Sequence, residues 1–195
     1  MRKISTRKDE IKKQKRNTLI ISIILIVVIS ASVFGIVANS FGSSEEPKEV
    51  NYQGYSFFSS GNYWILKQGD FQFVFLNNPN ELENLTFESN NLNLLPSYAQ
   101  KVLYIYSEEP TASYQVYQNL DMFTERIQQA CLEQDQEDCP ENNPIKTCTD
   151  NFVIIKESNL SKILQQENCV FIEGKKEDLI KLTDIFLLKI FGIKS

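Results

Sequence analysis

The feature that most constrains this chain is an uncharged apolar segment near its N-terminus. Residues 18–38 read TLIISIILIVVISASVFGIVA and contain neither a charged residue nor a proline. A helix rises about 1.5 Å per residue, so a run of this length crosses the hydrocarbon core of a bilayer, which is roughly 30 Å thick. The sequence therefore predicts a single transmembrane helix at residues 18–38, in contact with membrane lipid.

The charges on the two sides of this segment predict its orientation. Eight of the 20 basic residues but only two of the 25 acidic ones lie in residues 1–17, which leaves 12 basic against 23 acidic residues in the rest of the chain. Lys and Arg next to a span resist translocation. We therefore expect a basic cytoplasmic tail at 1–17, a polar linker at 39–50 and an extracytoplasmic domain at 51–195, in a single-pass protein of the cell membrane.

Two other N-terminal arrangements also place the domain outside the cytoplasm. A cleaved signal peptide has an apolar region of about 7–15 residues followed by small residues. The run here is longer, although Ala38-Asn39-Ser40 supplies the small residues. A type IV pilin needs a small residue, usually Gly, between the tail and the apolar run, where this chain has Lys15-Arg16-Asn17. The permanent anchor is the favoured interpretation.

Composition excludes several functions. The chain contains no His, so Ser–His or Cys–His nucleophile pairs and imidazole metal sites are impossible. Arg126 is the only Arg after the apolar segment. An acidic domain without clustered cations is a poor partner for nucleic acid, because phosphates must be neutralised. Acid–base chemistry by carboxylates remains open.

Strands are predicted from short aromatic and β-branched runs bounded by turn residues. Three such runs lie close together, at Tyr55–Phe58, Tyr63–Leu66 and Phe71–Phe75. A fourth, Val102–Tyr106, is apolar on both faces, which is typical of a central strand.

Two helices are predicted from apolar positions three and four residues apart. The first begins at Pro110, and its apolar stripe is Val116, Leu120, Phe123, Ile127 and Cys131. The second begins near Lys176 and ends at Gly192 in a left-handed cap, and its apolar face is Leu179, Leu182, Phe186 and Ile190. Strands at Phe152–Ile155 and Cys169–Ile172 separate them. The order β-β-β-β-α-β-β-α predicts an α+β domain in which two helices cover one face of a mixed or antiparallel sheet.

One set of short motifs resembles a known group of proteins. The run Cys169-Val170-Phe171-Ile172-Glu173-Gly174, with Glu177-Asp178-Leu179, Asp184 and Gly192-Ile193, resembles the C-terminal part of small archaeal proteins anchored in the membrane by one helix. The Tyr52–Leu66 hairpin resembles their exported N-terminal hairpin. The resemblance covers most of residues 50–193 and implies an exported Cys-containing domain. It implies no activity, and no functional residue is carried over.

The four cysteines, Cys131, Cys139, Cys148 and Cys169, all follow the apolar segment. An even number in an exported domain predicts two disulfides. Three pairings are possible, and we favour Cys139–Cys148, which closes a short loop, with Cys131–Cys169, which ties the first helix to a strand. The chain has no C-x-x-C motif of the kind found in zinc and thiol-redox sites. No metal or cofactor is therefore expected.

Two clusters are candidate binding sites. Carboxylates crowd the Cys loop, at Glu133, Asp135, Glu137, Asp138 and Glu141. They lack the EF-hand spacing, so a solvated acidic loop is favoured over a weak Ca²⁺ site. Aromatic residues crowd the first hairpin, where Tyr55 and Trp64 are the candidates for stacking on sugars or peptides. At strand spacing half of these aromatics should instead face the core, and a third interpretation places them at the outer membrane interface.

These observations favour a non-enzymatic, membrane-tethered extracytoplasmic binding or interaction domain, with a protein partner at the cell surface as one kind of ligand. The alternative is a structural subunit of a membrane or cell-envelope assembly, the pilin-like case included. A carboxylate-based enzyme is the third hypothesis, and it needs two acidic residues facing each other in a deep pocket.

Overall fold

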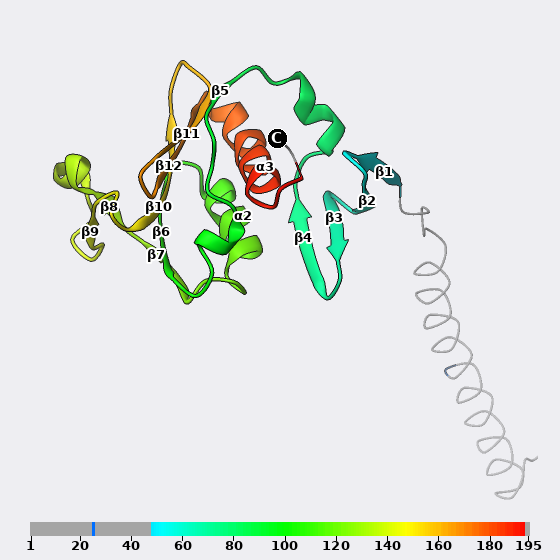
Figure 1. Ribbon diagram of the computed structural model, residues 1–195, viewed down its shortest axis with the longest axis horizontal. Helices are drawn as coiled ribbons and strands as arrows, with labels where there is room; N and C mark the ends of the chain where they lie inside the picture. Colours follow the sequence, from blue (N-terminus) through cyan, green and yellow to red (C-terminus); the bar gives the residue numbers. More distant parts are fainter. Residues whose placement is uncertain (1–24, 26–47, 194–195) are drawn as a thin grey trace, which may run out of the picture. The chain divides into compact units, whose positions relative to one another are not determined.

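The computed structural model describes residue 25 and residues 48–193 (Figure 1). One compact unit, Pro47–Ser195, contains the whole fold discussed below. The expected cytoplasmic tail, the transmembrane helix at 18–38 apart from Leu25, and most of the linker lie outside the described residues. Within the described residues, no helix is long and apolar enough to cross a membrane.

The domain begins with a four-stranded antiparallel sheet whose strands are neighbours in sequence. The strands are β1 (Glu49–Tyr52), β2 (Tyr55–Ser60), β3 (Tyr63–Gln68) and β4 (Phe71–Phe75). Two-residue turns connect them, and each turn has a glycine with positive φ: Gly54, Gly61 and Gly69. The prediction of three strands here is confirmed. β1 is a fourth strand, and it begins inside the expected linker.

The second sheet is mixed and has six strands in the order β5-β11-β12-β10-β6-β7. They are β5 (Glu88–Ser89), β6 (Val102–Ser107), β7 (Arg126–Gln129), β10 (Asn151–Glu157), β11 (Lys162–Gln166) and β12 (Cys169–Gly174). β12, β10, β6 and β7 run parallel, and β11 is antiparallel to β12. β6 lies between β10 and β7, so the prediction that Val102–Tyr106 is an interior strand of a sheet is confirmed.

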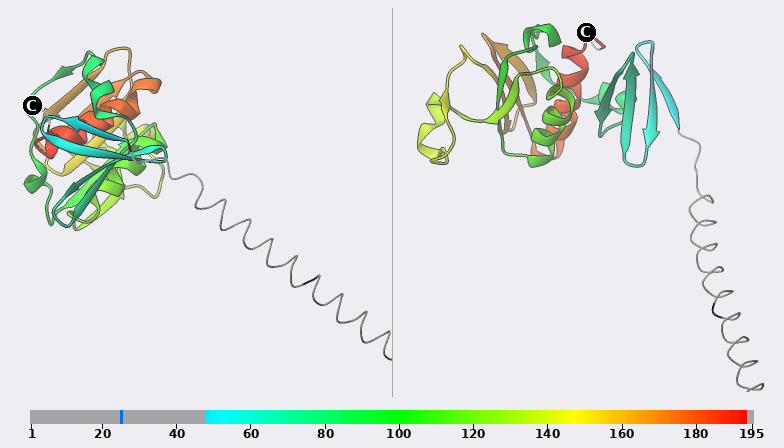
Figure 2. Two further views of the ribbon diagram at one scale, coloured as in Figure 1. Left: turned by 90° about the vertical axis from the view of Figure 1, so that its right-hand side faces the viewer. Right: turned by 90° about the horizontal axis from the view of Figure 1, so that it is seen from below.

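Helices α2 (Pro110–Leu120) and α3 (Leu179–Ile190) lie between the two sheets (Figures 1 and 2). Every residue of α3 from Leu182 to Leu188 is buried. A helix that is apolar on all sides needs cover on all sides, and two sheets provide it. The α+β class is therefore confirmed. The expectation that both helices cover one face of a single sheet is wrong, because they form the middle layer of three.

Both ends of α3 agree with the sequence. A short 3₁₀ turn, Lys176–Asp178, leads into the helix, close to the predicted start. Gly192 has a φ of +73°, and its N–H donates to the carbonyl of Lys189 at 3.0 Å. The predicted left-handed cap is confirmed.

Polar side chains of the helices pair with the free edge of β4. Asn119 of α2 accepts from the Val74 N–H at 2.9 Å and donates to the Val74 carbonyl at 2.8 Å, as a neighbouring strand would. Asp184 of α3 accepts from the N–H of Asn77 at 2.9 Å, from the Asn77 side-chain amide at 2.8 Å, and from the amide of Gln115. These bonds fix the first sheet to the helices, because edge groups buried without partners are costly.

The face of the six-stranded sheet away from the helices carries a second apolar cluster, which includes Tyr104, Phe152 and Ile154. Beside it, β8 (Cys131–Leu132) and β9 (Ile145–Lys146) form a two-stranded parallel sheet. They are joined through a loop that begins with an acidic 3₁₀ turn, Glu133–Asp138. The ammonium group of Lys146 lies 4.3 Å from the centre of the Tyr104 ring.

The first helix is shorter than its apolar stripe predicts. α2 ends at Leu120, and the remaining stripe positions, Phe123, Ile127 and Cys131, lie in a turn and in strands β7 and β8. The reason is tertiary: the edge of β6 offers residues 126–129 a parallel ladder, which outweighs the helical spacing. Strands β1, β5, β7, β8, β9 and β11 are absent from the predicted order.

Candidate functional site

A pocket lies where β6 and β7 end. Its volume is about 520 Å³, and it is lined by the sheet, by α2 and by the loop that follows β8. β6 and β7 are parallel and are connected through α2, so this is a strand–helix–strand unit. The carboxyl ends of parallel strands are a common place for ligand sites, because the connecting loops there leave a crevice.

The sheet contributes an apolar floor. Ile105 of β6 and Ile127 of β7 line the pocket and also contact the main core. Tyr106 lines it from the end of β6, and the ammonium group of Lys156 lies 5.2 Å from the centre of the Tyr106 ring. Gln129, at the end of β7, adds a side-chain amide to the same wall.

Helix α2 contributes two tyrosines. Pro110 occupies its first turn, and the Glu109 carboxylate caps it by accepting from the Thr111 N–H at 3.1 Å. Tyr114 and Tyr117 are one turn apart, so they are neighbours on the helix surface. Both line the pocket, and they remain 62% and 47% exposed. Exposed tyrosines at a pocket offer a flat apolar surface with a polar tip.

The loop between β8 and β9, residues 133–144, is called the disulfide loop below. It forms the third wall of the pocket through Pro140 and Asn143. A disulfide joins Cys131 to Cys139, immediately before Pro140. The Asn143 N–H donates to the Pro140 carbonyl at 2.9 Å, which closes a tight turn. On the sheet side, Asp135 of the loop forms an ion pair with Lys156. The wall is therefore covalently and electrostatically braced.

The lining contains no charged side chain. Its polar groups are hydroxyls and amides, and one of them is already used: the Ser107 hydroxyl donates to the Glu109 carbonyl at 2.7 Å and accepts from the Glu109 N–H at 3.1 Å. Ser113, Gln129 and Asn143 remain for a ligand. An apolar floor with aromatic walls and a few neutral polar groups suits the binding of a neutral ligand.

The disulfides differ from the favoured pairing. The structure joins Cys131 to Cys139 and Cys148 to Cys169, and no cysteine in the described residues is free. The expectation of two disulfides agrees with this geometry, but the pairing Cys139–Cys148 with Cys131–Cys169 is wrong. The favoured pairing assumes that Cys131 lies on the first helix. Cys131 instead starts the short strand β8, and the loop after β8 brings Cys139 back to it.

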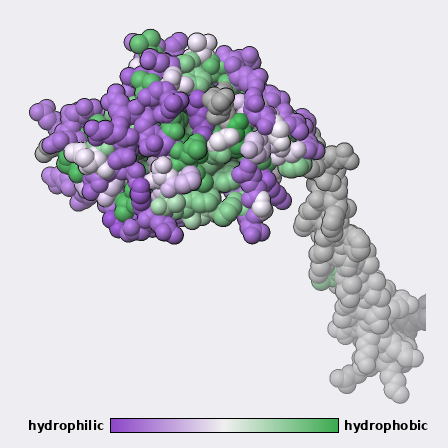
Figure 3. All heavy atoms as spheres, viewed as in Figure 1, coloured by the Kyte–Doolittle hydropathy of each residue, from purple (hydrophilic) through white to green (hydrophobic). Residues whose placement is uncertain are grey.

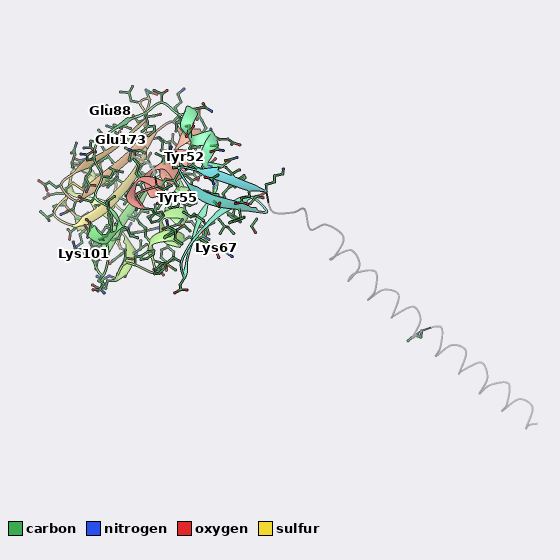
Figure 4. All side chains as sticks on the ribbon, turned by 45° about the vertical axis from the view of Figure 1, so that its right-hand side comes forward. Tyr52, Tyr55, Lys67, Glu88, Lys101 and Glu173 are labelled. Atoms are coloured by element: carbon green, nitrogen blue, oxygen red, sulfur yellow. A yellow bond between two sulfur atoms is a disulfide. The ribbon has the colours of Figure 1, made fainter. Side chains whose placement is uncertain are left out.

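The two aromatic candidates lie away from the pocket. Tyr55 of β2 pairs with Tyr52 of β1 at the first turn (Figure 4). Trp64 of β3 lies opposite Phe75 of β4. Tyr55 and Trp64 are both partly buried against the main core. Their position agrees with the favoured interpretation of these aromatics, in which they face the core.

Sequence reasoning missed the residues that line the pocket, above all Tyr114, Tyr117 and Gln129. A signal existed for the tyrosines, because they fall on the polar side of a predicted amphipathic helix, where large aromatic residues need an explanation. No signal existed for Gln129, since β7 itself was not predicted.

The described carboxylates of the acidic loop do not form a metal site. Within the described part of the chain, no group of three or more His, Cys, Asp or Glu side chains is arranged to hold a metal ion. One of the loop carboxylates, Asp135, is paired with Lys156.

A hydrophobic patch lies on a different part of the surface. Phe71, Leu94 and Met122 are 47%, 54% and 59% exposed. Phe71 packs against Phe123 with ring centres 5.0 Å apart. Leu94 lies at a second pocket of about 230 Å³, which is also lined by Phe191. Figure 3 shows hydrophobic side chains gathered in the middle of the face shown there.

No family model, curated protein or solved structure matches this chain. The resemblance to archaeal membrane-anchored proteins stays a prediction.

Proposed function

We propose that this chain is a membrane-tethered extracytoplasmic binding domain without enzymatic activity, and that its ligand occupies the pocket between α2, β7 and the disulfide loop. The observation that carries the proposal is the composition of that pocket, with tyrosines from α2 over an apolar floor and no charged group in the lining. The tether is the apolar segment at 18–38, and the two disulfides suit an oxidising compartment.

Binding is favoured over catalysis by the chemistry of the lining. A carboxylate enzyme needs an acid and a base within reach of one substrate. Neither pocket described above has an Asp or Glu in its lining. Asp184 has a raised pKa, but it is fully buried between helices and sheets, where no substrate reaches it.

The location is tested on intact cells that express the full chain with a C-terminal epitope tag. We expect protease added outside to remove the tag before lysis, because the positive tail holds the N-terminus inside. A cytoplasmic protein expressed in the same cells is the control for leakage. A tag that survives until the cells are broken would contradict the proposed topology.

The pocket is tested by substitution of one tyrosine. We screen the full chain in lipid nanodiscs against neutral oligosaccharides and against short peptides, and expect Tyr117→Ala to weaken the best ligand by about tenfold or more, the effect of losing an aromatic contact. The matched control is Tyr63→Ala, because Tyr63 is 45% exposed against 47% for Tyr117 but lies on β3, away from the pocket. Equal effects of the two substitutions would place the ligand elsewhere.

The second candidate function, a structural subunit of a membrane or cell-envelope assembly, rests on the hydrophobic patch around Phe71, Leu94 and Met122. Exposed apolar patches often mark interfaces. Purification in mild detergent separates the two functions, because a subunit carries a stoichiometric partner or self-associates, whereas a tethered binding domain is recovered as a monomer.

A further inference from the structure

The six-stranded sheet has an open edge next to the pocket. β7 is the last strand of the sheet. In a parallel ladder, alternate residues turn their N–H and C=O toward the same neighbour. The Ala130 N–H donates to the Ile105 carbonyl of β6 at 3.1 Å, so Ala130 and Gln128 face β6. The backbone groups of Ile127 and Gln129 therefore face away from β6, where no strand of the described chain pairs with them.

The chain itself shows that this edge accepts a strand. The backbone groups of Cys131, like those of Ile127 and Gln129, point away from β6. The Cys131 N–H donates on that side to the Pro144 carbonyl at 3.0 Å. There β9 pairs with β8 in parallel, with Cys131 opposite Ile145. The outer edge is therefore paired with β9 after Ala130, and it has no paired strand of the described chain before Ala130.

The open stretch borders the pocket on the side that faces α2. Ile127 and Gln129 line the pocket together with Tyr114 and Tyr117 of the helix, and Asn143 lies at the end where β9 begins. An edge strand beside a helix is a groove in which an extended peptide satisfies the free backbone groups and directs alternate side chains toward the helix. A sugar or another compact ligand would leave those backbone groups to water.

We propose that the ligand of this pocket is an extended peptide segment of a partner protein, which pairs with β7 as an additional strand and places one side chain against Tyr114 and Tyr117. This inference rests on the proposed function. The segment is neutral or basic, because the pocket lining is uncharged and Glu108 and Glu109 precede α2. The partner strand ends near Asn143, where the loop occupies the edge.

The experiment uses the full chain in nanodiscs and a displayed library of random linear heptapeptides as the probe. Selected peptides are measured against Gln129→Pro, which removes the outward N–H and leaves the β6 ladder intact, since proline is tolerated on edge strands. The matched control, Gln129→Thr, changes the side chain and keeps the N–H. Because both variants lose the side-chain amide that lines the pocket, the comparison isolates the backbone N–H, and we expect Gln129→Pro to bind the peptides about tenfold more weakly than Gln129→Thr.

A second measurement does not depend on the folding of the proline variant. Each backbone nitrogen of a selected peptide is methylated in turn, and binding to the unaltered chain is measured. Strand addition requires sensitivity at every second position, because only alternate N–H groups face β7. Loss at all positions alike, or at none, would overturn strand addition.

The outcomes also separate this inference from the proposed function. Peptides that depend on Tyr117 but respond equally to Gln129→Pro and Gln129→Thr, with no alternation in the methylation scan, would overturn strand addition and keep the pocket as the binding site. The same holds if no peptide is selected but a neutral oligosaccharide binds in a Tyr117-dependent way. If neither class binds, both proposals fail.

Discussion

Raising the pH from about 5 to about 8 is expected to destabilise the folded domain by roughly 3 kcal/mol, because Asp184 must then carry its charge in a buried position. Asp184 lies on α3 in the middle layer and is 0% exposed. Burial raises its pKa to about 7, although the hydrogen bonds from Asn77 and Gln115 act in the opposite direction. Removal of the surrounding water outweighs these donors.

The sign follows from the protons bound in each state. An unfolded Asp titrates near pH 4, so between about pH 4 and 7 the folded protein holds a proton that the unfolded chain releases. Stability therefore falls as the pH rises through this window and levels off above it. The chain has no His, so no side chain of ordinary pKa titrates between pH 5 and 8 and masks the effect.

Gln115 offers a partner for the protonated form. Its Oε1 atom is buried and accepts no hydrogen bond. A rotation of the amide by half a turn lets Oε1 accept from the protonated carboxyl of Asp184. The same rotation serves Asp184→Asn, whose side-chain N–H₂ can donate to Oε1 while its oxygen accepts from Asn77. This substitution is therefore the conservative control.

The measurement is urea unfolding of the full chain in a neutral detergent at several pH values, followed by the fluorescence of Trp64, the only tryptophan. We expect the unfolding free energy of the unaltered chain to decline between about pH 5 and 8, and that of Asp184→Asn to stay nearly level. An unaltered chain whose stability is level or rises over this range would show that Asp184 stays charged in the fold.

The sequence alone was sufficient for the elements in which local pattern and tertiary environment agree. The alternation of Phe71, Phe73 and Phe75 and the paired turn residues predict the β3–β4 hairpin, because one face of that sheet is buried and the turns need glycine. Gly192 predicts the end of α3 for a similar local reason. The middle position of α3 was not predicted, although the near absence of a polar face on this helix was visible in the sequence.

The candidate site was not predictable, because it depends on one local pattern that the fold overrides. The spacing of Leu120, Phe123, Ile127 and Cys131 is helical, yet only Leu120 is in the helix. The later residues instead form β7, which pairs with β6, and β8, which pairs with β9. β7 supplies part of the pocket floor and the open edge of the sheet. The same change moves Cys131 to β8, so that the pairing error and the missed site have one cause.

Removal of the Cys148–Cys169 disulfide by the double substitution to Ala is expected to lower the free energy of unfolding by about 3 kcal/mol, since the bond closes a loop of some 20 residues in the unfolded chain. The two cysteines are 21 positions apart, and the loop between them contains β10 and β11. Cys169 is fully buried at the start of β12. The bond therefore fixes the start of β12 to the segment between β9 and β10. The same urea titration at pH 7 measures the loss.

The double substitution of Cys131 and Cys139 is the informative comparison, because this bond closes a separation of only 8 residues next to the pocket wall. Chain entropy gives it a smaller stabilising effect, about 2.5 kcal/mol, but its loss frees Pro140 and Asn143 to move. We expect this variant to lose peptide binding while folded, and the Cys148–Cys169 variant to keep it. A digest of the unreduced protein checks the pairing directly. A peptide that links Cys139 to Cys148 would contradict the structure, and with it the argument that this loop is a fixed wall of the site.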